Sequence, residues 1–332
     1  MSESNQNKSL RPGQAIMCNL LEKEPGGYRG VILSYDIDAF VPSRDQLALG
    51  SSVPTTFVCM HNNRALVTFA YVVGTTERVQ FGLKNEDETP FTIWADSYPS
   101  NVKLRRAVDL IMPSITGPLA YSLTAKDCDV PQLIADIEAA GLTGCIKATS
   151  EEALSRSAVL LYKGRAVGCI YGSKNLPEAH LFDKALKRMF NDIKNDDAQI
   201  LVYELPEEIV LSMASLFIGC PVHEEESADK EAVEFINETL SELEEDGETA
   251  CFTLTSDEKT SRGLGFLCRG KRSGSFSILE QIFDTSFEQL FKLAENEEAI
   301  QGNAYLLPRE MISDSVLLGY SMSSYCSPGE AE

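Results

Sequence analysis

Residues 159–171 read VLLYKGRAVGCIY, and residues 265–277 read GFLCRGKRSGSFS. Each stretch consists of an apolar run, a turn centred on Gly164 or Gly270, and a second run of strand length. Runs of this length on either side of a Lys-Gly or Arg-Gly turn are typical of two strands joined by a short connection. The two stretches therefore predict two β-hairpins, and the elements around them decide the fold.

The elements around the two hairpins follow the same order. A helix and a strand precede each hairpin, and a helix, a strand ending in Leu-Pro and a further helix follow it. The first set comprises Gln132–Ala140, Cys145–Thr149, Leu181–Ile193, the strand running to Pro206 and Glu207–Ile218. The second set comprises Asp229–Glu245, Cys251–Thr255, Phe287–Ala294, the strand running to Pro308 and Arg309–Ser321. Six elements in the same order predict the tandem duplication of one α+β domain.

The first part of the chain predicts β-structure throughout. Turn residues separate five short strand candidates: Ala15–Glu22, Gly27–Ser34, Ala39–Pro42, Ser52–Met60 and Arg64–Val73. Five strands in about 70 residues favour a small barrel. The predicted fold class is multi-domain, with an all-β, OB-type five-stranded barrel followed by two α+β domains. The expected boundaries are a disordered tail at 1–12, the barrel at 13–84, a linker with a helix (Val102–Met112) at 85–116, the first α+β domain at 117–222, the divergent second one at 223–323, and a disordered tail at 324–332.

The formal net charge of the 332 residues is −21, and it is unevenly distributed. Residues 1–81 hold seven basic and seven acidic residues, whereas residues 224–248 hold twelve acidic residues and one Lys. Because contact with phosphates needs positive charge, this balance argues against nucleic-acid binding over the whole surface and against a polybasic membrane contact. Within residues 229–245 apolar positions recur at helical spacing, which predicts a helix with an acidic outer face.

The nine cysteines are scattered without a CxxC pair, and the three histidines lie far apart in the sequence. This pattern favours reduced thiols and excludes a zinc-ligand spacing. Residues 1–12 lack the apolar run of a secretory signal, and the most apolar stretch, Ile209–Val222, is too short to span a membrane. We therefore expect a cytoplasmic protein with no metal, no cofactor and no membrane contact.

An ordered set of motifs runs through the predicted barrel: Gly26-Gly27-Tyr28, Asp38-Ala39-Phe40-Val41-Pro42-Ser43 and Asn62-Asn63-Arg64. The set resembles the S-one repeat, the OB-fold repeat of the largest protein of the bacterial small ribosomal subunit. The resemblance implies a face that binds single-stranded RNA, with Tyr28 and Phe40 as aromatic sites and Arg64 as the basic site. The Gly-Gly-Tyr and Ala-Phe-Val-Pro pieces resemble a variant of the repeat that often docks proteins, so both kinds of ligand stay open.

The first duplicated unit carries a second resemblance. Gly117-Pro118-Leu119 opens it, Thr143-Gly144-Cys145-Ile146 follows its first helix, and the hairpin at 159–171 comes next. This order resembles the PATAN type of domain in bacterial signalling regulators, over 117–220 and more faintly over 229–322. The resemblance implies protein–protein contact or oligomer formation without catalysis.

Catalytic motifs are weak in this sequence. Residues 265–271 fit GxxxxGK, but Arg272 stands where a Ser or Thr would bind magnesium, and no helix is predicted to begin there. Asp36 and Asp38 lie between two barrel strands, where they predict a turn, and the chain has no GxSxG motif. We therefore expect no enzyme and no catalytic residue, with a site between the two duplicated copies as the remaining enzymatic alternative.

These patterns together predict a non-catalytic regulatory or adaptor protein of bacterial signalling that binds a protein partner of unknown identity. The alternative is an RNA-binding or translation-associated protein that uses Tyr28, Phe40, His61 and Arg64. Homo-oligomer formation is left open. The expected partner-binding residues belong to the acidic block and to the basic rim of the second hairpin: Glu224, Glu225, Glu226, Glu234, Glu238, Arg269, Lys271 and Arg272.

Overall fold

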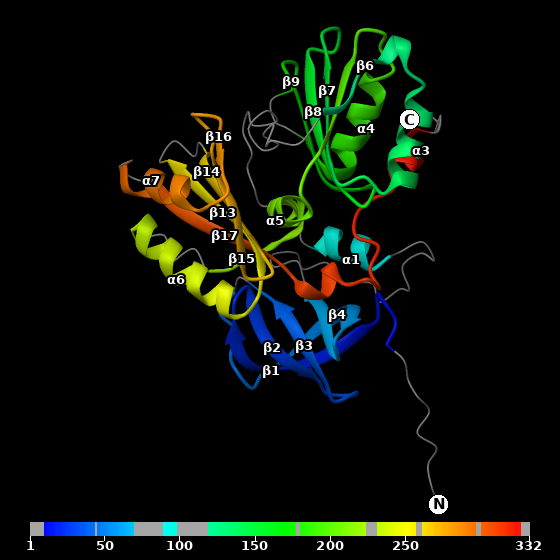
Figure 1. The fold of residues 1–332 in the computed structure, drawn as a ribbon. Coiled ribbons are helices and arrows are strands. Elements are labelled where there is room, and N and C mark those ends of the chain that lie inside the picture. The colour runs from blue at the N-terminus through cyan, green and yellow to red at the C-terminus, as the bar shows by residue number, and fades with distance from the viewer. Residues whose placement is uncertain are drawn as a thin grey trace, which may run out of the picture. The chain divides into compact units, whose positions relative to one another are not determined.

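A computed structural model describes residues 10–43, 45–69, 89–97, 119–176, 180–223, 231–256, 261–296 and 300–326. The chain forms two units (Figure 1), Met1–Ser97 with Pro308–Leu317 and Tyr98–Leu307 with Leu318–Glu332. Within the described part of the chain, none of the helices combines the length and the apolar character needed to cross a membrane.

The first unit contains a closed five-stranded barrel, blue in Figure 1, which confirms the predicted barrel and fits an OB type. Its strands are β1 (Ala15–Glu24), β2 (Gly27–Ile32), β3 (Ile37–Pro42), β4 (Ser52–His61) and β5 (Arg64–Phe69). They follow the order β1-β2-β3-β5-β4, and β4 pairs back with β1 to close the barrel. A bulge at Leu21 bends the ten-residue strand β1, which pairs with both β2 and β4.

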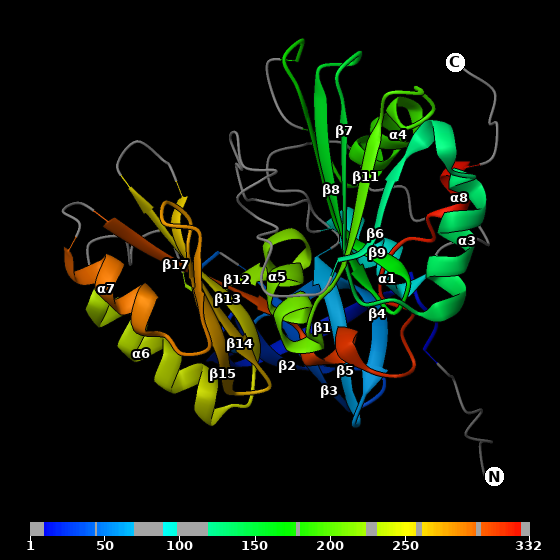
Figure 2. The same ribbon diagram turned by 45° about the horizontal axis from the view of Figure 1, so that its top comes forward.

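Burial along β1 alternates, so Ile16, Cys18 and Leu20 face the barrel interior. On the outside of the barrel, β4 and β5 contact two further elements (Figure 2), α1 (Pro90–Ser97) and the short 3-10 helix η3 (Arg309–Ile312). The expected linker helix Val102–Met112 lies outside the described residues, and α1 was not expected from the sequence.

The predicted helix Arg309–Ser321 is wrong. After η3 the chain runs without α-helix to Gly319, whose φ of 103° is a left-handed conformation. The hydroxyl oxygens of Ser313 and Ser315 lie 2.9 Å apart in this stretch. Serine side chains that bond locally compete with helical backbone hydrogen bonds, which explains why the helix does not continue. Residues 308–317 contact the barrel unit, although the sequence assigns them to the second α+β domain.

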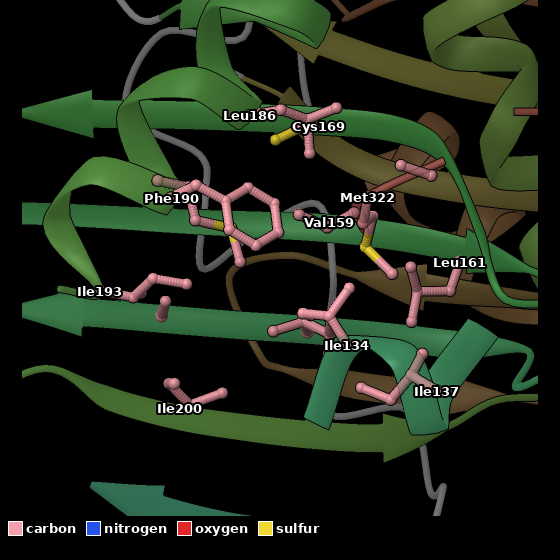
Figure 3. Packing of buried hydrophobic residues seen from close by; sticks show 14 of the residues in the cluster. Ile134, Ile137, Val159, Leu161, Cys169, Leu186, Phe190, Ile193, Ile200 and Met322 are labelled. Carbon is pink, nitrogen blue, oxygen red and sulfur yellow. The ribbon is translucent and has the colours of Figure 1, made fainter. Parts of the chain in front are cut away.

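The second unit contains two six-stranded antiparallel sheets, and the first has the order β10-β9-β8-β7-β11-β6. Its strands are β6 (Leu119–Thr124), β7 (Gly144–Ser150), β8 (Ser155–Tyr162), β9 (Arg165–Ser173), β10 (His180–Leu181) and β11 (Gln199–Glu204). The 3-10 turn η1 (Ala125–Asp127) leads to α3 (Val130–Ala140), and α4 (Phe182–Asp192) follows β10. Figure 3 shows the core of this layer, in which Phe190 of α4 lies beside Val159 of β8 and Ile137 of α3 lies further along the same face of the sheet.

The second sheet has the order β12-β17-β13-β14-β15-β16. Its strands are β12 (Cys220–Pro221), β13 (Thr249–Ser256), β14 (Ser261–Cys268), β15 (Lys271–Ser277), β16 (Ile282–Asp284) and β17 (Ile300–Leu307), and its helices are α6 (Ala232–Glu245) and α7 (Glu288–Asn296). An added Cβ at Gly265 would lie 2.8 Å from Leu290 of α7, so this glycine lets the helix approach the sheet closely.

The two sheets have the same strand order, because β6 to β11 and β12 to β17 fill the same places in turn. Their hairpin turns also match in detail. The N–H of Lys163 donates to Thr143 Oγ1 at 3.1 Å, and the N–H of Arg269 donates to Thr249 Oγ1 at 3.1 Å. A register shift interrupts both hairpins at the equivalent pair of residues.

One helix, α5 (Glu207–Ile218), contacts both sheets and has the predicted bounds. Every residue from Ile209 to Ile218 is buried, as expected of a helix that is apolar on all sides. Phe217 packs on Gly168 of β9, where an added Cβ would lie 2.5 Å from the ring. Towards the second sheet, Ser212 Oγ donates to Leu267 O at 2.8 Å.

The last described residues return to the first sheet of the second unit. Tyr320 bonds with Ala166, Met322 is fully buried in the core of that sheet, and Ser323–Cys326 form the short helix α8. The expected boundary at residue 323 therefore differs from the observed contacts. Of the tail expected at 324–332, residues 324–326 are helical and residues 327–332 lie outside the described part.

Candidate functional site

Tyr28, expected as an RNA-stacking residue, lies in the barrel core. Its side chain is 4% exposed. Its hydroxyl donates to Asp45 O at 3.1 Å and accepts from the N–H of Leu47 at 2.9 Å. Tyr28 therefore fixes the segment at 45–47 and does not offer a ring face on which a base could stack.

Phe40 and Arg64 do lie together, as the sequence predicts, but they are enclosed. Phe40 is 3% exposed, and the Arg64 guanidinium carbon lies 5.1 Å from its ring centre. Arg64 forms ion pairs with Glu24 and with Glu310 of η3, the latter at 3.3 Å from Nε to Oε1. Burial raises the pKa of Glu310, and the Arg64 charge opposes this rise. The positive charge of Arg64 is therefore matched by two carboxylates of the chain itself.

His61 pairs with Arg64 across the β4–β5 hairpin, and its Nε2 lies 2.9 Å from Asn62 Nδ2. On β2, Arg29 bonds to Glu22 at 3.0 Å and to Asp38 at 3.2 Å. A groove for single-stranded nucleic acid needs cations and aromatic faces directed at solvent. In the described barrel, Arg29 and Arg64 face carboxylates, and Tyr28 and Phe40 are buried, so this arrangement does not favour RNA.

The basic rim of the second hairpin also has acidic neighbours. Arg272 bonds to both carboxylate oxygens of Glu244, at 2.6 and 3.2 Å, and Arg269 lies 3.4 Å from Glu207 of α5. Lys271 between them is exposed. Bidentate arginine–carboxylate pairs are the stronger kind of surface ion pair. Arg272 therefore links the hairpin to α6, whereas Arg269 makes a single exposed contact with α5. Of the expected rim, Lys271 is directed at solvent.

The outer side of α6 carries a row of exposed carboxylates three or four residues apart, which we name the acidic ridge: Glu231, Glu234, Glu238, Glu242 and Glu245. Two of the predicted partner-binding residues, Glu234 and Glu238, belong to it, whereas Glu224, Glu225 and Glu226 lie outside the described residues. Burial and then the nearby Asp246 charge raise the pKa of Glu242. The ridge gives this face a concentrated negative potential.

An apolar patch on the barrel was not expected from the sequence. Four exposed side chains lie on β1 or beside it, and we name them the barrel patch: Met17 (43% exposed), Leu21 (45%), Leu33 (56%) and Leu49 (58%). The N–H of Leu33 donates to Met17 O at 3.3 Å, so Leu33 lies beside Met17, and the N–H of Gly50 donates to Leu20 O at 2.8 Å, which brings the loop that carries Leu49 to β1 next to Leu21. The sequence did contain a signal for this patch. Residues alternate between the two sides of β1, and apolar residues occur at positions on its outward side.

A buried polar cluster in the first sheet has no access to a substrate. Asp192 accepts from Ser155 Oγ at 2.5 Å and from the Tyr171 hydroxyl at 2.6 Å. All three residues are at most 9% exposed. Buried polar groups that satisfy one another in this way specify packing. We assign the cluster a role in positioning the end of α4.

The thiols are free, and several are deeply buried. Burial raises the pKa of Cys18 to about 11 and that of Cys145 to about 12. Burial, followed by the Glu310 charge, raises the pKa of Cys59 to about 12. A thiol nucleophile needs a lowered pKa and some exposure, so these thiols are of the structural kind. Among the described residues, no three His, Cys, Asp or Glu side chains converge as a metal site.

Comparison with known proteins matches residues 112–217 to a family model described as an uncharacterized protein conserved in archaea (DUF2226). No curated protein matches the chain. The matched stretch covers the first sheet, α3, α4 and nearly all of α5. It corresponds to the first of the two predicted α+β units.

This match corrects two predictions from the sequence. The assignment to bacterial signalling is wrong, because the matched family is conserved in archaea. The PATAN resemblance finds no support, since the matching family is a different one. The hairpin pattern that suggested it is made of apolar strands and a glycine turn, which unrelated antiparallel sheets share.

Proposed function

We propose that this chain is a non-catalytic protein-binding protein, and that it docks a basic protein partner through the barrel patch. The observation that carries the proposal is the exposure of Met17, Leu21, Leu33 and Leu49 around one strand. Large apolar side chains that are exposed near one another on a soluble protein are typical of protein-interaction surfaces.

The chemistry of the barrel favours a protein over RNA as its ligand. Arg29 and Arg64 face carboxylates of the same unit. Phe40 is covered, and η3 and α1 lie against β4 and β5. An apolar patch gains free energy from burial against another apolar surface, whereas it has no favourable contact with phosphates.

The net charge supports the choice of a basic partner. Two copies of a chain with −21 charges repel each other, whereas a cationic protein is attracted. The acidic ridge of α6 concentrates part of this charge. Such complementarity mainly raises the association rate and lowers it again at high salt.

We also propose that the second unit arose by tandem duplication of one α+β domain. Identical strand order, matched Thr-to-turn hydrogen bonds at Thr143 and Thr249, and a matched register shift support this origin. The one clear departure is α5, which is buried against both sheets. In the order along the chain, the second copy has η3 where the first has α5.

The test is affinity capture from an archaeal extract with three proteins: the wild type, Leu33→Glu and the matched control Leu279→Glu. Leu33 and Leu279 are 56% and 59% exposed, so neither change should disturb folding. We expect one basic protein to be captured by the wild type and the control, eluted by salt, and lost with Leu33→Glu. Equal capture by all three proteins contradicts the barrel patch. Saturable, salt-sensitive binding of labelled single-stranded RNA to the full chain contradicts the choice of a protein ligand.

A further inference from the structure

The segment Leu318–Cys326, which we name the clasp, binds the first sheet as an added peptide would. The N–H of Ala166 donates to Tyr320 O at 2.9 Å, and the N–H of Tyr320 donates to Ala166 O at 2.9 Å. Arg165 Nε donates to Gly319 O at 2.9 Å. These hydrogen bonds involve only backbone atoms of the clasp, so many different side chains are compatible with them. Peptides that pair with a strand are bound through the same kind of contact.

A single carboxylate holds the middle of the clasp. Glu138 Oε1 on α3 accepts from the N–H of Met322 at 2.5 Å, from the N–H of Ser323 at 3.1 Å and from Ser321 Oγ at 2.9 Å. Burial tends to raise the pKa of Glu138, but the hydrogen bonds from these three residues outweigh it and keep the pKa below its ordinary value. Charge-assisted bonds to backbone amides are strong and do not depend on side-chain identity.

Two side chains of the clasp provide apolar anchors. Met322 is fully buried, and Figure 3 shows it among Val159, Leu161 and Ile134. Tyr325 stacks on Phe190 of α4 with ring centres 6.1 Å apart, and its hydroxyl donates to Asp183 Oδ1 at 3.0 Å. Because α8 contacts both α3 and α4, the clasp occupies a site defined by Glu138, Ala166, Asp183 and Phe190, which we name the clasp site.

The second half of the chain fills the equivalent place differently. Glu244, the counterpart of Glu138, bonds to Arg272, which is the counterpart of Ala166. Helices α6 and α7 also contact each other directly there. In the second half, the position equivalent to the clasp site is therefore filled by side chains of that half itself. In the first half, the clasp site is filled by a segment from the end of the chain.

We propose that the clasp site is a peptide-binding site, occupied in this chain by its own clasp and open to a segment of a partner protein when the clasp leaves. The clasp itself defines the chemistry of the ligand: a residue that forms a β-bridge with Ala166, small polar residues facing Glu138, a Met-like anchor, and one helical turn that carries an aromatic residue with a hydroxyl three positions later. The site is separate from the barrel patch, and either proposal can fail alone. A tethered segment competes at an effective concentration in the millimolar range for short linkers, so a free peptide enters only after release.

The experiment uses the full chain carrying Met322→Asp, which places a charge in the core position of the clasp and releases it. The probe is a fluorescent peptide of residues 318–326 with Ser in place of Cys326, followed by fluorescence anisotropy. We expect saturable binding at least ten-fold tighter than to the wild-type chain. Adding Glu138→Gln should weaken it at least ten-fold, and the same peptide with Asp at the Met322 position should not bind.

The matched control is Leu317→Asp, a change at a 68% exposed position just before the clasp, which should bind the peptide no better than the wild type. If Met322→Asp fails to fold by circular dichroism, Tyr320→Pro replaces it, because it removes the amide that bonds to Ala166 together with the ring that contacts Phe182. Absence of peptide binding in a folded variant whose clasp amides exchange rapidly overturns the proposal. A wild-type dimer that Met322→Asp dissociates overturns the choice of partner, since a second copy would then supply the segment.

Discussion

Alanine at Gly164 tests whether the first hairpin turn packs on α3 as closely as the geometry indicates. Gly164 has a φ of 77°, and an added Cβ would lie 2.8 Å from both Cα and O of Glu138. Gly270 has the same arrangement in the second half, with a φ of 71° and a Cβ position 2.7 Å from Glu244 O. Because the opposing atoms belong to a helix backbone, they cannot move aside without shifting the helix.

Two other glycines separate the contribution of the conformation from that of the contact. Gly141 and Gly247 have φ values of 62° and 69°, but nothing lies within 4 Å of an added Cβ at either. A left-handed alanine costs about 1–2 kcal/mol, which is the loss expected for these two controls. Overpacking adds about 1–3 kcal/mol, so Gly164→Ala and Gly270→Ala should each lose about 2–5 kcal/mol.

The assay is urea unfolding followed by far-ultraviolet circular dichroism. The single tryptophan, Trp94, lies in the other unit, so its fluorescence is the wrong probe for these variants. Equal losses for all four glycine variants would show that the contact with the helix backbone contributes nothing. A large loss at Gly164 without one at Gly270 would refute the equivalence of the two hairpin turns.

Three further predictions concern single side chains. Arg64→Ala should lower the stability of the barrel unit by about 3–5 kcal/mol in urea unfolding followed by Trp94 fluorescence, because buried Glu310 loses a cation. Adding Glu310→Gln should recover at least half of that loss, and no recovery would contradict the ion-pair argument. Iodoacetamide at pH 8 should modify Cys128, which is partly exposed, faster than Cys59, which is buried and whose pKa burial raises to about 12. Mass spectrometry that finds Cys59 modified first would contradict this expectation. Since the folded pKa of Glu138 is lowered, its stabilisation of the clasp is complete above the ordinary carboxyl pKa and is lost as pH falls through the lowered value. Hydrogen exchange of the clasp, corrected for intrinsic rates, should therefore accelerate in acid, and Glu138→Gln should remove that dependence.

Much of the fold could be predicted because its signals are local. The turn at Gly164 and the all-round apolar character of α5 each follow from a few neighbouring residues. The prediction of a helix at Arg309–Ser321 was wrong. Serines of this segment form local hydrogen bonds, and contacts with the barrel unit determine the path of the chain there.

The candidate sites were harder to predict than the elements. Phe40 and Arg64 were expected on one exposed face, and they do lie together, but Glu310 comes from the far end of the chain to pair with Arg64. No pattern within a short stretch of sequence predicts an ion pair between residues so far apart in the chain. The barrel patch was missed for the opposite reason, because Met17 and Leu21 in a short strand resemble core residues until the other side of the strand is known to face inward.

The sequence by itself determined the turns, the repeated order of elements and the acidic outer face of α6, since these depend on backbone conformation, side-chain period and charge within short windows. Tertiary structure alone decided which residues are covered. In the folded chain Phe40 is buried, Arg64 forms an ion pair with Glu310, and the clasp bonds to Glu138. The physical reason is that burial and ion pairing depend on which distant segments meet, and the free energy that selects those contacts is summed over the whole chain.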